Sequence, residues 1–523
     1  MLHNITNVTK IQGGRLMYYN WSKSRSEDHI DRLCDKVSEV TIKEYTRDKS
    51  LTEIDVNEAY AMNAVHLYVD ILNLEGILTT QTGTESETTH KRAIRFFDSH
   101  VRAIKFILAE TQSIFVDFHN QRLHAVIAKP YGTDNEKARL DRAIAIADLV
   151  MDSVQQKREV DGDEAIEPAE IRIGIDSGLA LAVNNGRTSN REPLFLGDPA
   201  NHAAKHSCGK TVGIYLTENA RSVLGLNLEA NQDTKKVKLK ASEIEASKQS
   251  AGLALTCQDV LNELKNNEKK LQDFIFSRTT PPLKGLEFDK LYYKSAKRQE
   301  IVSIYADIDG FTNFVSENID TEEGQKNVVR ALHVLRSEMD DTLYKDFKGI
   351  RVRFVGDCLH GLICEGTAYS TNHPKSVDVA TEAVSAIRSS FLMALDKLNE
   401  RFAIAGLDDL GLAIGYELGD VSLTRVGKVG DTSRYAIGVS TIESEEAQKV
   451  CMGNATKIGT EAHSHLSDKY KELFNNQIGA DLTYDKVKSA DQATDNQSES
   501  TKSNLYDSAP QAHVGLKAHA QFK

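Results

Sequence analysis

The chain repeats itself once, and this internal duplication restricts its fold more than any other feature of the sequence. Three segments of the first half recur in the second half, in the same order and at a nearly constant spacing of about 240 residues. The pairs are HLYVDIL (66–72) with SIYADID (303–309), VDFHNQRLHAVIA (116–128) with VRFVGDCLHGLIC (352–364), and RIGIDSG (172–178) with AIGYELG (413–419). Because 523 residues are too many for one hydrophobic core, the repeat predicts two copies of one domain in tandem.

Domain boundaries follow from the repeat and from changes in composition. A polar stretch rich in Lys and Glu separates the copies and is expected to be a partly helical linker. The end of the chain is rich in Ser, Asn, Asp and Gln, which predicts disorder. The predicted units are an N-terminal helical extension (1–59), a first domain (60–225), the linker (226–296), a second domain (297–475) and a polar, disordered tail (476–523).

Composition excludes several classes of partner. The net charge of −12 and the lack of a long basic block argue against nucleic acid. No apolar run approaches the length of a membrane span, and the N-terminus lacks the apolar region of a signal peptide, so we expect no membrane partner and a cytoplasmic protein. The six cysteines show no Cys-x-x-Cys spacing, which favours reduced thiols over disulfides or a zinc site.

Two aspartates in the second half follow predicted strands. IVSIYAD (301–307) is a β-rich run that ends at Asp307, and Asp309-Gly310 then breaks the strand. GIRVRFV (349–355) predicts a second strand, which Gly356-Asp357 turns into a third. If the first two strands are neighbours, the carboxylates of Asp307 and Asp357 meet at one rim of a sheet. Such hard oxygen ligands suit Mg²⁺ or Mn²⁺, although an aspartate before or after glycine can also be a plain turn residue.

These segments resemble those of the class III nucleotidyl cyclases. That family carries a Phe/Tyr-Ala-Asp-Ile-x-Gly-Phe-Thr segment and a later Gly-Asp, which YADIDGFT (305–312) and Gly356-Asp357 match in full. The resemblance implies an α+β, ferredoxin-like domain with its site at a domain interface, and conversion of a nucleoside triphosphate into a 3′,5′-cyclic monophosphate and pyrophosphate. It also implies two Mn²⁺ or Mg²⁺ ions, bound by Asp307, Asp357 and the carbonyl group of Ile308.

The first half has lost part of this pattern and kept another part. Gln121 stands where the second half has Asp357, so the first half lacks a carboxylate pair. Its segment GDPANHAAKHS (197–207) resembles the family's Gly-Asp-x-Val-Asn-x-Ala-x-Arg, with Asn201 at the asparagine and Lys205 at the arginine. The resemblance implies that Asn201 orients the ribose and that Lys205 stabilises charge on the reacting phosphorus.

The second half shows the opposite loss, because Ile442 and Glu446 occupy the positions of Asn201 and Lys205. The two halves therefore complement each other, and the resemblance implies an intramolecular pseudo-dimer with one composite site that a monomer can complete. The alternative is that Asn201 and Lys205 are ordinary solvated residues one helical turn apart. Lysine also departs from the family's arginine, since an ammonium group cannot fork onto two phosphate oxygens.

Triphosphate contacts require further cations near the site. The candidates are basic residues close to the glycine that opens the second repeat helix and residues just after the first domain. None belongs to a motif, so ordinary solvation is the alternative for each. They are Lys428, Arg434, Lys236 and Lys238.

In the class III family, the residue four positions before the Gly-Asp aspartate helps to choose the base, and the base pocket belongs to the half opposite the metal ions. The resemblance therefore implies that Asp117 contacts the base, while its counterpart Arg353 lies in the degenerate pocket. A carboxylate accepts hydrogen bonds, so Asp117 favours cytosine N4, or guanine N1 and N2, and repels uracil O4. Tyrosine at 68 and 305, where the family often has phenylalanine, adds bulk that favours a small base. In this respect the chain resembles the bacterial Pycsar pyrimidine cyclases.

The sequence therefore predicts a cytidylate cyclase that converts CTP to cyclic CMP. The resemblance to the Pycsar cyclases implies that this product is a messenger sensed by a separate effector in anti-phage defence. Uridylate, guanylate and adenylate cyclases of the same fold are alternatives, as is a degenerate nucleotide-binding regulator without activity. The complementary losses argue against the regulator, because random decay does not leave one complete set of parts.

Overall fold

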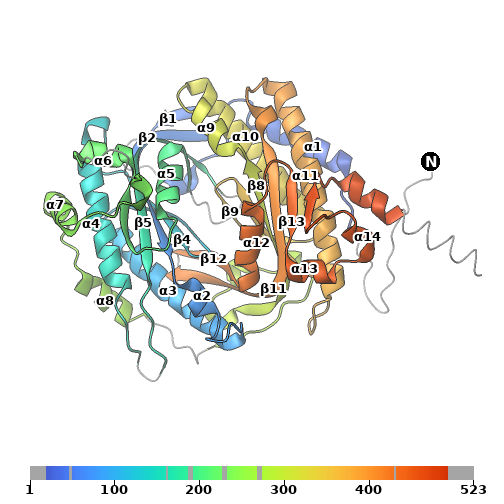
Figure 1. Ribbon diagram of the computed structural model, residues 1–523. Coiled ribbons are helices and arrows are strands. Elements are labelled where there is room, and N and C mark those ends of the chain that lie inside the picture. Colours follow the sequence, from blue (N-terminus) through green and yellow to red (C-terminus); the bar gives the residue numbers. More distant parts are fainter. Residues whose placement is uncertain are drawn as a thin grey trace, which may run out of the picture.

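The structure is a computed structural model that describes residues 19–45, 50–160, 163–185, 193–226, 233–267, 274–428 and 431–492. Two halves, each built of helices and strands, lie side by side, the first in blue to green and the second in yellow to red (Figure 1). Mixed sheets and helices in each half agree with the predicted α+β class.

The described part of the first half contains a seven-stranded sheet in the order β3-β4-β2-β5-β6, with β1 also paired to β2 and β7 to β5. Its longest helix, α3, starts at a capping box in which Ser86 and Thr89 satisfy each other's backbone N–H groups. The strands are β1 (Thr41–Glu44), β2 (Glu58–Ile71), β3 (Ile114–His119), β4 (Arg122–Ile127), β5 (Ile171–Asn184), β6 (Pro193–Leu196) and β7 (Gly213–Leu216), and the helices are α2 (Leu74–Leu78), α3 (Glu87–Glu110), α4 (Glu136–Val154), α5 (Asp198–Ser207) and α6 (Glu218–Leu224).

The second half repeats this topology. Its described sheet has the order β14-β13-β11-β8-β10-β9, with β12 paired to β11, so β8, β10, β9 and β11 correspond to β2, β4, β3 and β5. The strands are β8 (Lys297–Asp309), β9 (Ile350–Val355), β10 (Cys358–Ile363), β11 (Gly411–Lys428), β12 (Asp431–Ile437), β13 (Ala455–Ile458) and β14 (Ile478–Ala480), and the helices are α9 (Phe311–Asn318), α10 (Glu322–Asp341), α11 (His373–Phe402), α12 (Val439–Lys449), α13 (Thr460–His465) and α14 (Asp468–Lys471).

One strand neighbour differs from the sequence-based expectation. The strand that ends at Asp307 does not pair with the strand over 350–355, because β10 lies between β8 and β9. Asp357 still reaches the end of β8, since it sits in the tight turn that joins β9 to β10.

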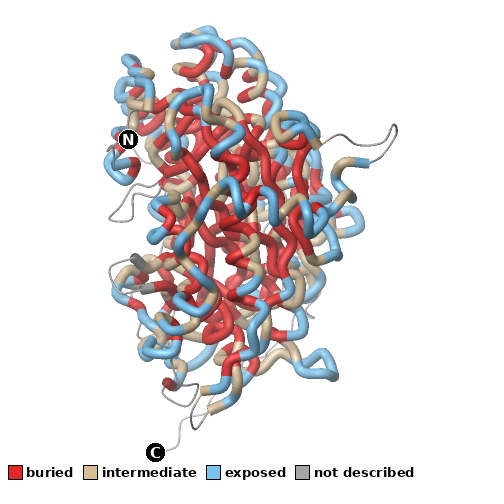
Figure 2. The backbone as a smooth tube through the Cα atoms, turned by 90° about the vertical axis from the view of Figure 1, so that its left-hand side faces the viewer, coloured by how far each residue is buried: buried red, intermediate tan, exposed pale blue. Residues whose placement is uncertain are grey.

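The halves exchange parts of their cores. Figure 2 shows buried backbone running through the whole body. Leu181 and Leu194 of the first half belong to the core formed by α10 and α11, whereas Tyr435 and Ile437 of β12 belong to the core under α3. Polar contacts tie the same surfaces together: Arg102 of α3 donates to the Gly427 carbonyl oxygen at 2.9 Å. The two halves thus form one body with a shared apolar interior.

The N-terminal extension connects both halves. Helix α1 (Lys23–Lys36) packs on α10 and α11 and lies beside them in Figure 1, while β1 continues the first sheet by pairing in parallel with β2. The Arg25 guanidinium contacts the Glu338 carboxylate at 2.9 Å, and Nδ1 of His29 lies 2.6 Å from the same carboxylate. Within the described residues of the predicted helical extension, 23–36 form an α-helix and 41–44 form a strand; residues 1–18 and 46–49 lie outside the described part.

Two boundaries differ from the expected ones. In the linker, α7 (Ala241–Ala251) and α8 (Cys257–Lys265) pack on α3 and α4, so this segment belongs to the first half's body. The tail is not disordered from residue 476, because β14 pairs with β13, and Leu482, Tyr484 and Val487 are buried. Polar residues separate these apolar side chains along the sequence, so the composition of the segment as a whole indicated disorder. Residues 493–523 lie outside the described part.

Across the residues that the structure describes, no helix is both long enough and apolar enough to cross a membrane.

Candidate functional site

A cavity of about 190 Å³ opens between the two halves. Its first-half wall comes from the face of β2, β3 and β4, from β6 and from α5. Its second-half wall comes from α9, α12 and the turn between β9 and β10. The lining residues are Tyr68, Asp117, His119, Arg122, His124, Leu194, Phe195, Leu196, Gly197, Ala200, Asn201, Ala204, Phe311, Thr312, Val315, Val355, Gly356, Asp357 and Glu445.

The carboxylates of Asp307 and Asp357 lie together on the second-half side of this cavity, and Asp357 lines it. Both residues are half-buried, and burial raises the pKa of Asp307 to about 6, with the Asp309 carboxylate adding to the rise. Burial and the nearby Asp307 carboxylate raise the pKa of Asp357 well above its usual value. The two carboxylates therefore repel each other, and a divalent cation between them would relieve this repulsion.

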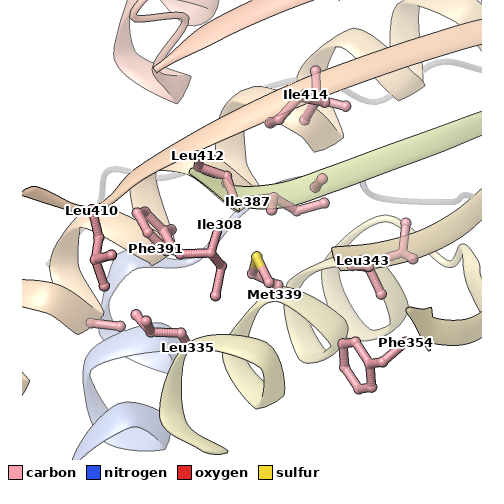
Figure 3. Close-up of a cluster of buried hydrophobic side chains, with 14 of the residues drawn as sticks. Ile308, Leu335, Met339, Leu343, Phe354, Ile387, Phe391, Leu410, Leu412 and Ile414 are labelled. Carbon is pink, nitrogen blue, oxygen red and sulfur yellow. The ribbon is translucent and has the colours of Figure 1, made fainter. Parts of the chain in front are cut away.

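Local packing fixes this pair. The side chain of Ile308 points to the opposite side of β8, into an apolar cluster with Leu335 and Phe391 (Figure 3). Because neighbouring strand residues face opposite ways, burial of Ile308 turns Asp307 toward the cavity. The Ile308 N–H donates to the Asp357 carboxylate and so holds the turn against β8.

The donor set fits a hard divalent cation. Mg²⁺ and Mn²⁺ bind through one or two carboxylates and complete their shells with water and substrate phosphates. Asp307 and Asp357 provide such a pair, with Asp309 turned away to accept a hydrogen bond from the Gly453 N–H at 2.5 Å. Within the described residues no larger His, Cys, Asp and Glu group could hold a metal, so any ion here depends on these two carboxylates and a bound phosphate.

Asn201 faces the aspartates from the opposite wall. It lies in the first turn of α5, which follows Gly197 at a φ of 133°, a conformation that favours glycine. A Cβ atom at Gly197 would lie 3.1 Å from Cδ1 of Ile319, a residue of the other half. Ser316 of α9 also donates to the Asp198 carboxylate at 3.0 Å. Close approach of α5 and α9 thus places Asn201 and Asp357 in one cavity.

Lys205 does not line the cavity. It lies one turn beyond Asn201 on α5, is exposed, and forms no ion pair within the part of the chain that the structure describes. A side chain of this length can reach a bound triphosphate from the rim.

Of the four proposed triphosphate cations, the three whose side chains the structure describes do not line the cavity. The Arg434 guanidinium forms an ion pair with the Asp289 carboxylate at 2.6 Å. Lys236 is exposed and pairs with Asp233 at 3.4 Å, and Lys238 is exposed next to Gly213. Lys428 ends β11, and its side chain lies outside the described residues. The structure brings neither Arg434 nor the two lysines after the first domain to this site.

Asp117 and Tyr68 lie together on the first-half wall of the cavity. A bulge before Asp117 places it opposite His124, whose ring stacks on that of Tyr68 with the centroids 4.1 Å apart. Arg122 completes this face, 3.6 Å from the Asp70 carboxylate. The sequence analysis missed Arg122, yet it follows Gln121 directly and shares a strand face with His124, a pattern that could have revealed it.

Tyr305 does not line this cavity. It lies in the equivalent place of the other half, where its hydroxyl group is 3.3 Å from Oδ1 of Asn120 and 3.2 Å from Nδ1 of His360. Arg353 fills the rest of that place by donating to the carbonyl oxygens of Phe118 and Arg434. Protein groups thus fill the place that corresponds to the cavity in the repeat, which we call the mate pocket. The expected role of Tyr305 in base binding is wrong for the open cavity, because its repeat partner Tyr68 occupies that position.

Glu445 is a second lining residue that the sequence analysis missed. It stands on α12 opposite Ala204 of α5 in the repeat, and contacts the Lys449 ammonium at 2.6 Å and Nε2 of His119 at 3.3 Å. Although burial opposes ionisation, these two neighbours hold the pKa of Glu445 well below its usual range. It therefore adds a fixed negative charge between the two halves.

Comparisons with known proteins agree with this geometry. No family model matches the chain. A uridylate cyclase from Pseudomonas aeruginosa is 47% identical over 463 residues, which cover 88% of both chains. Another uridylate cyclase, from a Rhizobium species, is 34% identical over 445 residues, covering 82% of this chain and 83% of the relative. A crystal structure of a class III adenylyl cyclase-like ATP-binding protein from Pseudomonas aeruginosa superimposes with a TM-score of 0.86 at 44% identity, over 91% of this chain and all of that one.

The fold, the facing carboxylates and these likenesses define a class III nucleotidyl cyclase. The chain belongs to the Pycsar-type branch of that family, together with the two uridylate cyclases, and is an enzyme.

Proposed function

We propose that the protein is a uridylate cyclase, which converts UTP to 3′,5′-cyclic UMP and pyrophosphate. The observation that carries the proposal is the single cavity in which Asp357 of one half faces Asn201 and Asp117 of the other. Both curated relatives are uridylate cyclases, which favours UTP among the pyrimidine nucleotides.

The tandem arrangement supports one site per chain. In the proposal, residues 60–225 and 297–475 are two ferredoxin-like cyclase domains that form an intramolecular pseudo-dimer. Their sheets share one strand order. Helix α3 of the first half packs on β11 and β12. In the equivalent contact, Arg336 of α10 donates to Oδ1 of Asn185, the residue after β5, at 2.6 Å. Side chains fill the mate pocket, whereas the cavity that Asp357 and Asn201 line is open.

In the proposed reaction, the ribose 3′-oxygen forms a bond to the α-phosphorus, the bond from that phosphorus to the β-phosphate oxygen breaks, and the 3′-hydroxyl proton leaves to solvent. Asp307, Asp357 and the Ile308 carbonyl group would hold two Mn²⁺ or Mg²⁺ ions, which lower the pKa of the hydroxyl group and neutralise phosphate charge. The Asn201 amide would hold the ribose in line for attack. The Lys205 ammonium would approach the phosphate oxygens from the rim of the cavity.

Base recognition combines an acceptor with donors. The Asp117 carboxylate would accept the N3–H of uracil, and the Arg122 guanidinium, on the same face, would donate to a uracil carbonyl group. CTP was predicted from Asp117 alone, because a carboxylate repels uracil O4. Arg122 adds a hydrogen-bond donor on the same face, so a uracil carbonyl group can also be bound there. Tyr68 closes the face with a bulky ring that favours a pyrimidine.

CTP is the second candidate, because the Asp117 carboxylate also suits the amino group of cytosine. In either case we propose that the cyclic nucleotide is a messenger for a separate effector protein in defence against phage.

The test is to incubate the full chain with all four ribonucleoside triphosphates and Mn²⁺ and to identify the cyclic products by mass. We expect cyclic UMP as the main product. Cyclic CMP as the main product would replace UTP by CTP. A purine product, or none from any nucleotide, would overturn the proposal.

A further inference from the structure

Two buried histidines lie at the wall of the cavity next to Asp117 and Tyr68, and neither has a role in the reaction above. His124 lines the cavity, and His66, on the neighbouring strand, lies behind it with no exposed surface. Nδ1 of His66 is 3.0 Å from Nε2 of His124, a hydrogen bond in which one ring must donate and the other accept. Burial lowers the pKa of His66 to about 3 and that of His124 well below its usual value, so both rings are neutral.

The outer nitrogens of the pair decide which ring donates. Nε2 of His66 is buried and has no hydrogen-bond partner within the described residues. If His124 donated to His66, this orphan nitrogen would carry a hydrogen, and a buried N–H without an acceptor is rarer than an unpaired acceptor. His66 therefore carries its proton on Nδ1 and donates to His124. A neutral imidazole carries a proton on only one of its two ring nitrogens. Because Nε2 of His124 accepts the hydrogen bond, the proton of His124 is on Nδ1.

The mate pocket shows how such a nitrogen is used. There, His360 stacks on Tyr305 as His124 stacks on Tyr68, and Ser303 replaces His66 at 3.2 Å from Nε2 of His360. Nδ1 of His360 is hydrogen-bonded to the Tyr305 hydroxyl group. In contrast, Nδ1 of His124 makes no hydrogen bond within the described residues. It also differs from Nε2 of His66, because it is not one of the buried polar atoms without a partner. Because His124 is otherwise buried, the cavity is where this nitrogen can meet a partner.

We propose that His124 donates its Nδ1–H to the O4 carbonyl group of the pyrimidine, and that His66 is a positioning residue that fixes this tautomer. This inference rests on the proposed function and names the residue that separates UTP from CTP. Uracil O4 accepts such a hydrogen bond. Cytosine has an amino group at the same position, which would set two donors against each other and leave the His124 N–H unpaired.

The first experiment compares His124→Phe with the matched variant His360→Phe in the mate pocket. Phenylalanine keeps a ring stacked on the tyrosine and removes the donor. Competition between UTP and CTP should show a fall of about 10- to 100-fold in the UTP preference of His124→Phe, from loss of kcat/KM for UTP. His360→Phe should keep the wild-type preference, whatever its effect on thermal stability. An unchanged preference in His124→Phe would overturn the inference and leave the proposed function intact.

A second pair of variants separates positioning from packing. The side-chain amide of His66→Asn can still donate to Nε2 of His124, whereas His66→Leu cannot. We expect His66→Asn to retain most of the UTP preference and His66→Leu to lose it. Equal preferences in the two variants would remove the positioning role of His66.

The tautomer itself is measured in the wild-type protein without turnover. Long-range nitrogen NMR of ¹⁵N-histidine-labelled chain, assigned with the His66 and His124 variants, distinguishes protonated from bare ring nitrogens. We expect both rings to carry the proton on Nδ1 in the absence of nucleotide. A bare Nδ1 on His124 would overturn the inference even if UTP is the substrate. If wild-type enzyme shows no preference for UTP, the proposed function fails instead.

Discussion

The cavity and its mate use the same strands and helices but are filled differently. At the cavity, Asp117 and Asn201 leave open space in front of Asp357. At the mate, Arg353 spans the equivalent space and donates to two backbone carbonyl groups of opposite halves, and the Tyr305 hydroxyl group meets Asn120. A duplicated fold therefore provides two equivalent places, and a few side chains decide which one stays open.

The strongest way to break this comparison is to remove the side chain at each of the two equivalent turns. Asp357→Ala should lower kcat by about a thousandfold or more, because one carboxylate cannot hold two cations against the triphosphate. Gln121→Ala, the same change at the mate position, should leave kcat within about threefold. Cyclic nucleotide formation at saturating UTP and Mn²⁺ measures both. Comparable losses in the two variants would contradict a single site.

The ribose side gives a second matched pair. Asn201→Ala should lower kcat by about a hundredfold, since the 3′-hydroxyl group is no longer held in line with the α-phosphorus. Ile442→Ala removes a side chain at the corresponding place on α12 and should affect thermal stability more than kcat. The comparison is contradicted if Ile442→Ala shows the larger loss of turnover.

Removing the Arg353 side chain tests why the mate pocket is filled. Arg353→Ala leaves the carbonyl oxygens of Phe118 and Arg434 without their donor, and should lower the free energy of unfolding by about 1–3 kcal/mol, measured by urea denaturation. Calorimetric titration with a non-hydrolysable UTP analogue should still give one nucleotide per chain, because Gln121 lacks the carboxylate of Asp357 and Ile442 lacks the amide of Asn201. Two nucleotides per chain would show that Arg353 alone closed the mate.

A smaller effect concerns α1, which packs on α10 and α11 of the second half. Burial disfavours the charged form of His29, but hydrogen bonds to Asp341 and Glu338 raise its pKa above 6.5. A raised folded-state pKa stabilises the fold fully below the unfolded value of about 6.5, and this contribution is lost as the pH rises through the folded-state value. His29→Gln should therefore cost about 1–2 kcal/mol of unfolding free energy near pH 6 and less near pH 9. Urea denaturation at both pH values checks this, and a larger cost at the higher pH would refute it.

Parts of the site could be predicted from single segments. The strand ending at Asp307, the turn at Asp357 and the helix carrying Asn201 each have a local signal, namely apolar runs broken by Gly-Asp or Asp-Gly and a repeat that marks the equivalent residues. Arg122 and Glu445 had no such strong signal. Their place in the cavity depends on which strand faces and helix turns oppose each other across the two halves.

The sequence by itself determined the duplication, the fold class and the unequal distribution of carboxylate and amide between the halves, because these depend on residue type and spacing along one chain. Tertiary structure decided which basic residues reach the cavity and which tyrosine lines it, and it drew the expected tail up to residue 492 into the body. Such outcomes depend on contacts between segments hundreds of residues apart, and no local pattern encodes the close approach of α5 to α9.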